Sequence, residues 1–490
     1  MRRHHSFDIF DTLVARRCIE ARNIFLEVEN EVRLHGFANL RVQAELAVAA
    51  GPHTLDDIYA VLVRQFGFDA EVAEYLKGRE IEAEICNAIG IRESLDAVEH
   101  GDVLVTDMYL PRWVILKILD KAGLRKKVGL VISSAGKRTG EIWPKLGAVL
   151  ALEQHAGDNP HSDVKSPLGC GVFAEHVVSS NLSAYENFLR QNGFELLARL
   201  MREVRLTALG TGQSTEIKQQ RQLQINHNIP ILVLASVYLS LLSKRLGVSN
   251  ILFSSRDCHY LQRIFSALEE KAGWNLPSEY FYTSRLCRVA PSQAYLKYFA
   301  DRATNRSLVV DLCGTGWSLG HLYTQAGVTP RTFFLHDLKG NNAKGAEIYE
   351  SVKKSAGDFV ASSLVSDPGL KNIGLELVNY VDSGMVTDVM NVEGYCSMVP
   401  VFEHPNYPAN VLKTIHEFEE TQEIFHGVLQ RHDVPALVKE VQRHAGKLAG
   451  VVAELYRNLG QSVSCVDDLA QYHGRQDAKT LWKLRQQAAR

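Results

Sequence analysis

The chain alternates short apolar runs that end in polar residues with stretches in which apolar residues recur every three or four positions. Residues 6–10, "VLVT" within 101–111 and "VGLVISS" (128–134) have the pattern of strands, and the stretches between them have helical spacing. Strands alternating with helices form parallel sheets with helical crossovers. A second alternation begins near residue 229. The sequence therefore predicts an α/β fold with two parallel-sheet blocks.

The chain has 490 residues, which exceeds what one hydrophobic core normally organises. The pattern predicts a first α/β domain with a helical insertion, a helical connector, a second α/β domain and a mostly helical C-terminal region. Their expected bounds are 1–180 with the insertion over about 15–98, then 181–225, 226–370 and 371–490.

Composition argues against several classes of protein. Hydrophobic residues make up 46% and charged residues 22%, which is ordinary for a globular protein. A formal net charge of −2 gives no electrostatic basis for a nucleic-acid partner, and none is expected. Eight cysteines stand singly, at Cys18, Cys86, Cys170, Cys258, Cys287, Cys313, Cys396 and Cys465. This spacing favours reduced thiols in a cytoplasmic protein.

The longest apolar stretch, 229–242, has about 14 residues, whereas a membrane-spanning helix needs about 20. It is predicted to be a buried helix. The N-terminus is basic but lacks the apolar run of a signal peptide, so no membrane insertion is expected. The sequence says nothing of the oligomeric state.

Polar residues at the predicted strand ends of the first block supply the parts of a phosphoryl-transfer site. Asp8 is a candidate nucleophile, because a carboxylate can attack phosphorus when a cation neutralises the charge. Thr106 and Lys137 are candidates to hold the phosphoryl oxygens. Asp158 and Asp163 are candidate metal ligands or their support, since Mg²⁺ prefers oxygen ligands. Asp163 has a second interpretation, in which it only orients Lys137.

Four segments in order resemble the motifs of haloacid dehalogenase-like (HAD) hydrolases: "FDIFDTL", "VLVTDMYLP", the lysine of "GKRTG", and "GDNPHSD". The resemblance covers roughly residues 5–180. It implies a Rossmann-like core with a helical cap, an aspartyl-enzyme intermediate, and Mg²⁺ bound through Asp8, the backbone carbonyl of Phe10, and Asp158.

One position departs from the family pattern. Phosphatases of this superfamily carry a general acid two residues after the nucleophile, where this chain has Phe10. Asp11 comes one position later, and successive side chains of an extended segment point in different directions. A slow phosphatase, unusual phosphoryl chemistry and a site that only binds are therefore all open.

The second block contains a strand, an aspartate and a glycine-rich turn that opens a helix, "VVDLCGTGWS". Successive N–H groups of such a turn point at one anion, which predicts a phosphate site formed by Asp311, Gly314, Thr315, Gly316 and Ser318. The alternative is a turn that is glycine-rich only for tight packing. The pattern resembles the phosphoribosyl diphosphate loop of type I phosphoribosyltransferases, with Val310 in place of one acidic residue.

Two further predicted strands end in "SSRD" and "YTSR", which makes Arg256 and Arg285 candidate phosphate ligands. Arg256 alternatively pairs with Asp257. The whole layout also resembles large bacterial HAD-like proteins predicted from polysaccharide gene neighbourhoods.

Together these features predict a cytoplasmic, Mg²⁺-dependent phosphatase for a small phosphorylated molecule, a sugar or nucleotide phosphate. It would be fused to an α/β domain that binds a phosphorylated ligand. Two alternatives are open: a bifunctional enzyme with a C-terminal phosphoribosyl or glycosyl transferase, and a non-catalytic protein that binds sugar phosphates.

Overall fold

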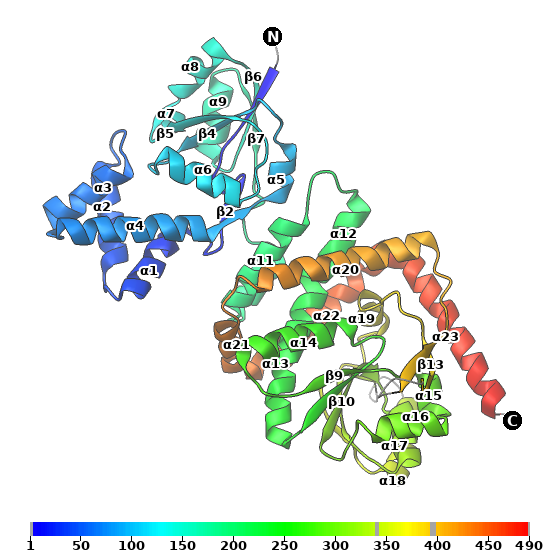
Figure 1. Cartoon of the computed structure of the whole chain (residues 1–490). Coiled ribbons are helices and arrows are strands. Elements are labelled where there is room, and N and C mark those ends of the chain that lie inside the picture. The colour runs from blue at the N-terminus through cyan, green and yellow to red at the C-terminus, as the bar shows by residue number, and fades with distance from the viewer. Residues whose placement is uncertain (1–2, 339–342, 393–397, 489–490) are drawn as a thin grey trace. The chain divides into compact units, whose positions relative to one another are not determined.

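The protein consists of two compact units, drawn in Figure 1. The computed structural model describes residues 3–338, 343–392 and 398–488, so Cys396 lies outside the described residues. The first unit comprises Met1–Ser183 and Arg202–Gln213, and the second comprises Ala184–Met201 and Ser214–Arg490. Each unit has a five-stranded parallel sheet with helices around it, which confirms the predicted α/β class.

The sheet of the first unit has its first strand at the centre, in the order β5-β4-β1-β6-β7. The strands are β1 (Arg3–Phe7), β4 (Val103–Asp107), β5 (Gly129–Ser133), β6 (Ala151–Gly157) and β7 (Phe173–His176). The chain builds β4 and β5 on one side of β1, and then crosses to the other side for β6 and β7. Ligands of open α/β sheets bind beyond the carboxyl ends of the strands at such a crossing. Asp8 follows β1 there, and Asp158 follows β6.

Helices of the first unit fall into an inserted cap and a set around the sheet. The cap helices are α1 (Ala21–Val32), α2 (Phe37–Val48), α3 (Leu55–Phe66) and α4 (Ala70–Asn87). The others are α5 (Arg92–Ala97), α6 (Arg112–Lys121), α7 (Gly136–Thr139), α8 (Ile142–Val149), η1 (Pro160–Lys165) and α9 (Ser166–Gly169). Local sequence sets two cap boundaries. Thr54 and Asp57 form a capping box at α3, and the Asp69 carboxylate accepts N–H bonds at α4.

Two parts of the first unit differ from the predicted pattern. Strand β6 is not evident from the sequence pattern, because Glu153, Gln154 and His155 interrupt its apolar run. The insertion contains, besides its helices, the antiparallel pair β2 (Val14–Arg16) and β3 (Ala88–Gly90), which joins its two ends.

The sheet of the second unit has the order β12-β11-β10-β8-β9. Its strands are β8 (Asn250–Ser254), β9 (Ser278–Phe281), β10 (Ser307–Gly314), β11 (Arg331–Asp337) and β12 (Val360–Val365). The chain passes from β8 to β9 on one side, and then crosses to the other side for β10. The crossing therefore lies between β8 and β10, whose carboxyl ends lead into "SSRD" and "CGTGWS".

Many helices surround this second sheet. The segment predicted as a connector contains α10 (Ala184–Gln191), α11 (Glu195–Ala208), α12 (Thr215–Leu223) and part of η2 (Gln224–Asn228). Those that follow are α13 (Ile229–Leu246), α14 (His259–Ala272), α15 (Arg285–Val289), α16 (Gln293–Ala300), α17 (Trp317–Ala326), α18 (Ala343–Ala356) and α19 (Ile373–Val378).

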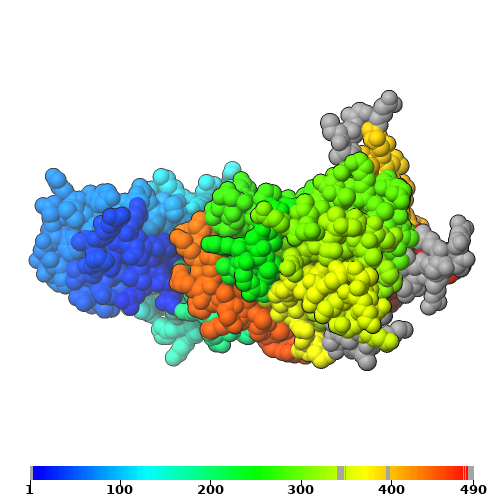
Figure 2. All heavy atoms as spheres, turned by 90° about the horizontal axis from the view of Figure 1, so that it is seen from below, coloured from blue at the N-terminus to red at the C-terminus, as the bar shows by residue number. Residues whose placement is uncertain are grey.

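The C-terminal region is mostly helical but contains a hairpin that the sequence pattern did not reveal, β13 (Val386–Met390) with β14 (Val399–Phe402). Its helices are α20 (Ala409–Leu429), α21 (Val434–Arg443), η4 (Ala445–Lys447), α22 (Leu448–Ser462), η5 (Val463–Val466) and α23 (Asp467–Ala488). Helix α21 packs on α13 and α14, and Figure 2 shows orange C-terminal residues beside green ones on one face.

Helix α13 contains the longest apolar stretch of the chain. Thr215–Leu246 is the one segment of the described residues that is long and apolar enough to cross a membrane, and 67% of its most apolar window is buried inside the structure. Thirteen residues of α13 are buried. The predicted buried helix is confirmed, and its burial is that of a core helix.

Buried His227 makes the stability of the second unit depend on pH. Its Nδ1 lies 3.1 Å from the Leu455 carbonyl oxygen, to which the ring N–H donates. Burial lowers the pKa of His227 from 6.5 to about 4. A depressed histidine pKa favours folding above pH 6.5, and this contribution is lost as the pH falls towards 4. It amounts to on the order of 3 kcal/mol.

We therefore expect the unfolding temperature of the second unit to fall between pH 6.5 and 4, and His227→Gln to flatten this dependence while keeping a donor for the Leu455 carbonyl. Scanning calorimetry across this pH range measures the effect, and His35→Gln, at an exposed histidine, is the matched control. Equal pH slopes in wild type and His227→Gln would contradict the expectation.

Candidate functional site

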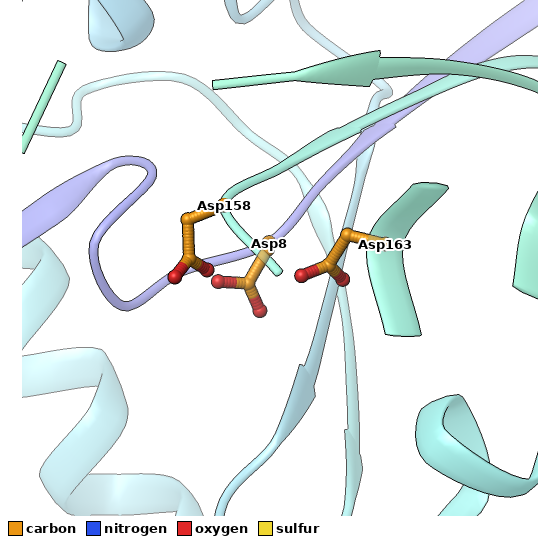
Figure 3. A group of neighbouring side chains, drawn as sticks. All are labelled: Asp8, Asp158 and Asp163. Atoms are coloured by element: carbon orange, nitrogen blue, oxygen red, sulfur yellow. The ribbon is translucent and has the colours of Figure 1, made fainter. Parts of the chain in front are cut away.

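Asp8 lies at the carboxyl end of the central strand of the first sheet. Its backbone N–H donates to the Ala156 carbonyl at 2.8 Å, which continues the pairing of β1 with β6 by one residue. The side chain is 6% exposed. Figure 3 shows the Asp8 carboxylate between those of Asp158 and Asp163, with the three groups facing one another.

Lys137 contacts two of these carboxylates. Its Nζ lies 2.5 Å from Asp8 Oδ1 and 2.5 Å from Asp163 Oδ1, and the side chain is buried. The backbone N–H groups of Lys137 and Arg138 both donate to the Asp107 carboxylate at 3.0 Å, which fixes the start of α7. The neighbouring Arg138 is exposed and donates to the Ala49 carbonyl at 3.1 Å. Of the two adjacent cations, only Lys137 is therefore at the site.

Asp163 is held from several sides. Its Oδ1 lies 3.1 Å from His155 Nε2, and its Oδ2 accepts the Asn159 N–H at 3.0 Å. A side chain at position 157 would meet Asp163 Cγ at 2.4 Å, so Gly157 makes room for this carboxylate. Asn159 itself caps η1, by accepting the N–H groups of the next residues. Hydrogen bonds with His155 and Asn159 thus position the Asp163 carboxylate, which holds the Lys137 ammonium in place through an ion pair.

Asp158 differs from Asp163 because its side chain makes no hydrogen bond or ion pair with any described residue. Burial, together with the charges of Asp8 and Asp11, raises the pKa of Asp158 to about 7. Burial likewise raises the pKa of Asp8 to about 6, although Lys137 opposes this. For Asp163, the His155 hydrogen bond and the Lys137 charge outweigh burial and lower the pKa to about 2. One ammonium thus faces three carboxylates.

The residues present fit a small divalent cation. Oxygen atoms of Asp8, Asp158 and Asp163 lie within 4.8 Å of one another, which makes them a group able to hold a metal ion. Since protein donors occupy Asp163, the carboxylates of Asp8 and Asp158 are the better candidates for ligands. Carboxylate oxygens, completed by water and phosphate oxygens, are what Mg²⁺ prefers, and a cation would relieve the repulsion that raises the two pKa values.

The other predicted residues of this site lie in β4 or in the segment that follows β1. Thr106 is buried at the carboxyl end of β4, beside β1. Phe10 follows Asp8 by two residues, and the Arg16 guanidinium lies 4.5 Å from the centroid of its ring. Asp11 has a positive φ of 59°. Burial raises the pKa of Asp11, and the charges of Arg16 and Arg202 oppose this.

The second unit contains a cavity of about 1150 Å³ at the carboxyl end of its sheet. All seven residues predicted from the sequence as ligand contacts of this domain line it: Arg256, Arg285, Asp311, Gly314, Thr315, Gly316 and Ser318. They come from the segments after β8, β9 and β10. Sequence reasoning missed the contributions of the C-terminal region. Glu403, directly after β14, Glu419 in α20 and His473 in α23 also line the cavity.

Packing and backbone conformation explain why two positions of the glycine-rich turn are occupied by glycine. A side chain at position 314 would meet the Phe334 ring at 2.6 Å, and Gly316 has a φ of +84° where α17 begins. Asp311 is buried and accepts from Arg288 at 2.7 Å. The glycines and Asp311 are thus needed for the fold of this edge, whatever ligand the cavity takes.

Comparison with known proteins does not assign the chain to a class. No family model matches it, and no curated protein matches its sequence. The functional assignment therefore depends on the geometry of the two sites and on the motifs of the sequence.

Proposed function

We propose that the first unit is a Mg²⁺-dependent phosphatase acting on a small phosphorylated molecule, a sugar or nucleotide phosphate, through an aspartyl-phosphate intermediate on Asp8. The observation that carries the proposal is the Asp8 carboxylate at the crossing point of the sheet, bonded to Lys137 and adjacent to the unpartnered Asp158. The order of the four HAD-like motifs supports the same chemistry.

In this mechanism an Asp8 oxygen attacks the phosphorus atom and the ester oxygen leaves. Lys137, held by Asp163, stabilises the negative charge on the transferring phosphoryl group, and the Thr106 hydroxyl donates to one of its oxygens. Water then attacks the aspartyl phosphate and releases phosphate, which restores the Asp8 carboxylate. Bound at Asp8 and Asp158, Mg²⁺ supplies positive charge that offsets the repulsion between carboxylate and phosphate.

The leaving oxygen needs a proton, and Phe10 occupies the place of the usual acid. Protonation by a positioned acid typically contributes about 10²–10⁴-fold to the rate. A phosphatase with Phe10 at this position is therefore expected to be slow with alkoxide leaving groups, and faster with a good leaving group such as p-nitrophenolate.

The cap is placed to select the substrate. Its loop after α2 contacts the loops that carry the site, because the His53 N–H donates to Ser134 Oγ at 2.8 Å and Arg138 donates to the Ala49 carbonyl. The Leu55 N–H donates to the Tyr109 carbonyl at 3.0 Å, just after β4. A cap held over a phosphoryl-transfer site excludes water and contacts the rest of the substrate.

A panel of phosphorylated metabolites, with p-nitrophenyl phosphate as reference, tests the proposal. The protein with Mg²⁺ should release phosphate from at least one sugar or nucleotide phosphate, and chelation of Mg²⁺ should stop the reaction. No turnover of any compound would contradict a phosphatase and favour the alternative of a protein that only binds sugar phosphates.

Metal affinity gives a prediction independent of turnover. Asp158→Asn removes one of the two carboxylates with the fewest protein partners, so we expect Mg²⁺ to bind at least about tenfold more weakly, a loss typical of a charged contact. Isothermal titration with Mg²⁺ measures this. The matched control is Asp120→Asn, which removes an exposed carboxylate of the same unit that pairs with Arg125. Unchanged Mg²⁺ affinity in Asp158→Asn would contradict the assigned ligands.

The transferase alternative places a second reaction in the second unit, with Asp311 contacting a phosphoribosyl group. The 2.7 Å pair of Asp311 with Arg288 already engages this carboxylate, which favours the phosphatase as the primary activity. Pyrophosphate release from phosphoribosyl diphosphate, abolished by Asp311→Asn, would reverse this preference. A cytoplasmic location remains part of the proposal, since seven described cysteines are free thiols.

A further inference from the structure

The cavity of the second unit has the position and lining of a ligand site. It lies beyond the carboxyl ends of β8 and β10. Between these two strands the chain crosses from one side of the sheet to the other. Open α/β sheets bind ligands at such crossing points. Its volume of about 1150 Å³ slightly exceeds the usual range for small-molecule sites, roughly 300–1,000 Å³.

Two guanidinium groups line the wall of the cavity, those of Arg256 and Arg285. Arg256 is half-buried and lies over the Tyr380 ring, with 3.9 Å between its Cζ and the ring centroid. Neither Arg256 nor Arg285 forms an ion pair with a carboxylate of the described residues. The sequence alternative in which Arg256 pairs with Asp257 is therefore not what the structure has. Cations that line a cavity and form no ion pair with a carboxylate favour an anionic ligand.

The adjacent carboxylate is also without a partner. The side chain of Asp257 is half-buried on the cavity wall and makes no hydrogen bond or ion pair with a described residue. Two other acids of the cavity are occupied, since Asp311 accepts from Arg288 at 2.7 Å and Glu376 lies 3.3 Å from His473 Nε2. A carboxylate and guanidinium groups that form no ion pair with a described residue fit a ligand that carries hydrogen-bond donors as well as negative charge.

Aromatic side chains complete the lining. Tyr280, Tyr407 and Trp317 all line the cavity, and the Tyr280 hydroxyl donates to the Arg256 carbonyl at 3.1 Å, which fixes the segment that carries both free charges. Flat aromatic faces suit the apolar faces of sugar rings and bases, while leaving their hydroxyl groups for polar partners.

We propose that this cavity binds a phosphorylated sugar, with its phosphate at Arg256 and Arg285 and a sugar hydroxyl donating to Asp257. The site is separate from the Asp8 site and does not depend on the activity of the first unit. A simple sugar phosphate and a nucleoside diphosphate sugar share this chemistry, and the size of the cavity accommodates either.

Isothermal titration of the full chain in EDTA tests the proposal, with glucose 6-phosphate, UDP-glucose, glucose, UMP and inorganic phosphate as probes. We expect saturable binding of glucose 6-phosphate or UDP-glucose, at least about tenfold tighter than of glucose, UMP or phosphate. Binding of glucose 6-phosphate identifies a simple sugar phosphate as the source, and binding of UDP-glucose alone identifies a nucleotide sugar.

Variants locate the binding. Arg256→Gln and Asp257→Asn should each weaken it at least about tenfold, whereas Asp8→Asn in the first unit should leave it unchanged. Arg302→Gln is the matched control, because Arg302 also lies over a tyrosine ring, at 4.0 Å from the Tyr298 centroid, but outside the cavity. Thermal unfolding of each variant reports its folding.

Three results would overturn the proposal: no saturable binding of either sugar compound, equal affinity for inorganic phosphate or UMP, or binding that is the same in wild type, Arg256→Gln and Asp257→Asn. The titration contains no Mg²⁺ and does not depend on turnover. A negative result would therefore reject the sugar-phosphate site of the second unit without contradicting the proposed phosphatase.

Discussion

Asp8→Asn will abolish the Mg²⁺-dependent release of phosphate. Asparagine has nearly the same shape but no charge, so it cannot attack phosphorus, and it loses the ion pair that Asp8 makes with Lys137 at 2.5 Å. Loss of a covalent nucleophile removes the main pathway, and we expect kcat to fall by at least about 10³-fold. The measurement is phosphate release from the best substrate of the metabolite panel.

The control for this experiment is a second buried aspartate of the same unit. Asp102 is 5% exposed and accepts the His5 N–H at Oδ1 and the Glu99 N–H at Oδ2. Asp102→Asn keeps one of these two acceptors, lies outside the acidic group of Asp8, Asp158 and Asp163, and should retain activity. If Asp8→Asn hydrolyses phosphate esters at the rate of wild type, Asp8 is not the nucleophile and the proposed mechanism is wrong.

Arg41→Met will destabilise the cap more than any surface change. Arg41 is fully buried and donates to Glu80 at 2.7 Å through both Nε and Nη2, and Glu80 is also fully buried. The Tyr59 hydroxyl donates to the same carboxylate at 2.7 Å. Without Arg41, Glu80 remains as an unpaired buried carboxylate, and removing one partner of such a pair costs about 3–5 kcal/mol.

Hydrogen exchange of peptides from the cap measures this loss of stability separately from the second unit. Arg79→Met is the matched control, since Arg79 pairs with Glu31 and Glu82 at the surface and its loss should have a much smaller effect. The double variant Arg41→Met/Glu80→Gln should recover part of the stability, because Glu45, the other partner of Arg41, is half-exposed and no fully buried charge is then left unpaired. Equal protection in wild type and Arg41→Met would contradict a stabilising role for the pair.

The sequence predicts most of the elements that end at the two sites. Strands β4, β8 and β10 are apolar runs followed by polar residues, so both their existence and the residues at their ends can be read from local pattern. Strand β1 (Arg3–Phe7) begins and ends three residues before the predicted strand 6–10, because Arg3, His4 and His5 give its first half a polar pattern. Strand β6 is different. His155 is fully buried, between Ser6 at 2.9 Å and Asp163 at 3.1 Å, and this contact over 149 residues makes a polar segment suitable for the interior of a sheet.

Details within the sites also depend on distant contacts. Sequence alone does not choose between Lys137 and Arg138, and the structure does so because Asp107 binds both backbone N–H groups and directs Lys137 inward. Likewise, the partner of Arg256 is the ring of Tyr380, 124 positions later in the chain, rather than its neighbour Asp257. The local sequence pattern does not reveal contacts between residues that are far apart in the chain.

A crystal structure with Mg²⁺ and beryllium trifluoride, a mimic of the phosphoryl group on aspartate, tests the central claim most directly. We predict beryllium trifluoride on the Asp8 carboxylate, in contact with Lys137, and a metal ion contacting Asp8 and Asp158. If crystals soaked with both compounds show neither at these side chains, the first unit is not a phosphatase of the proposed kind.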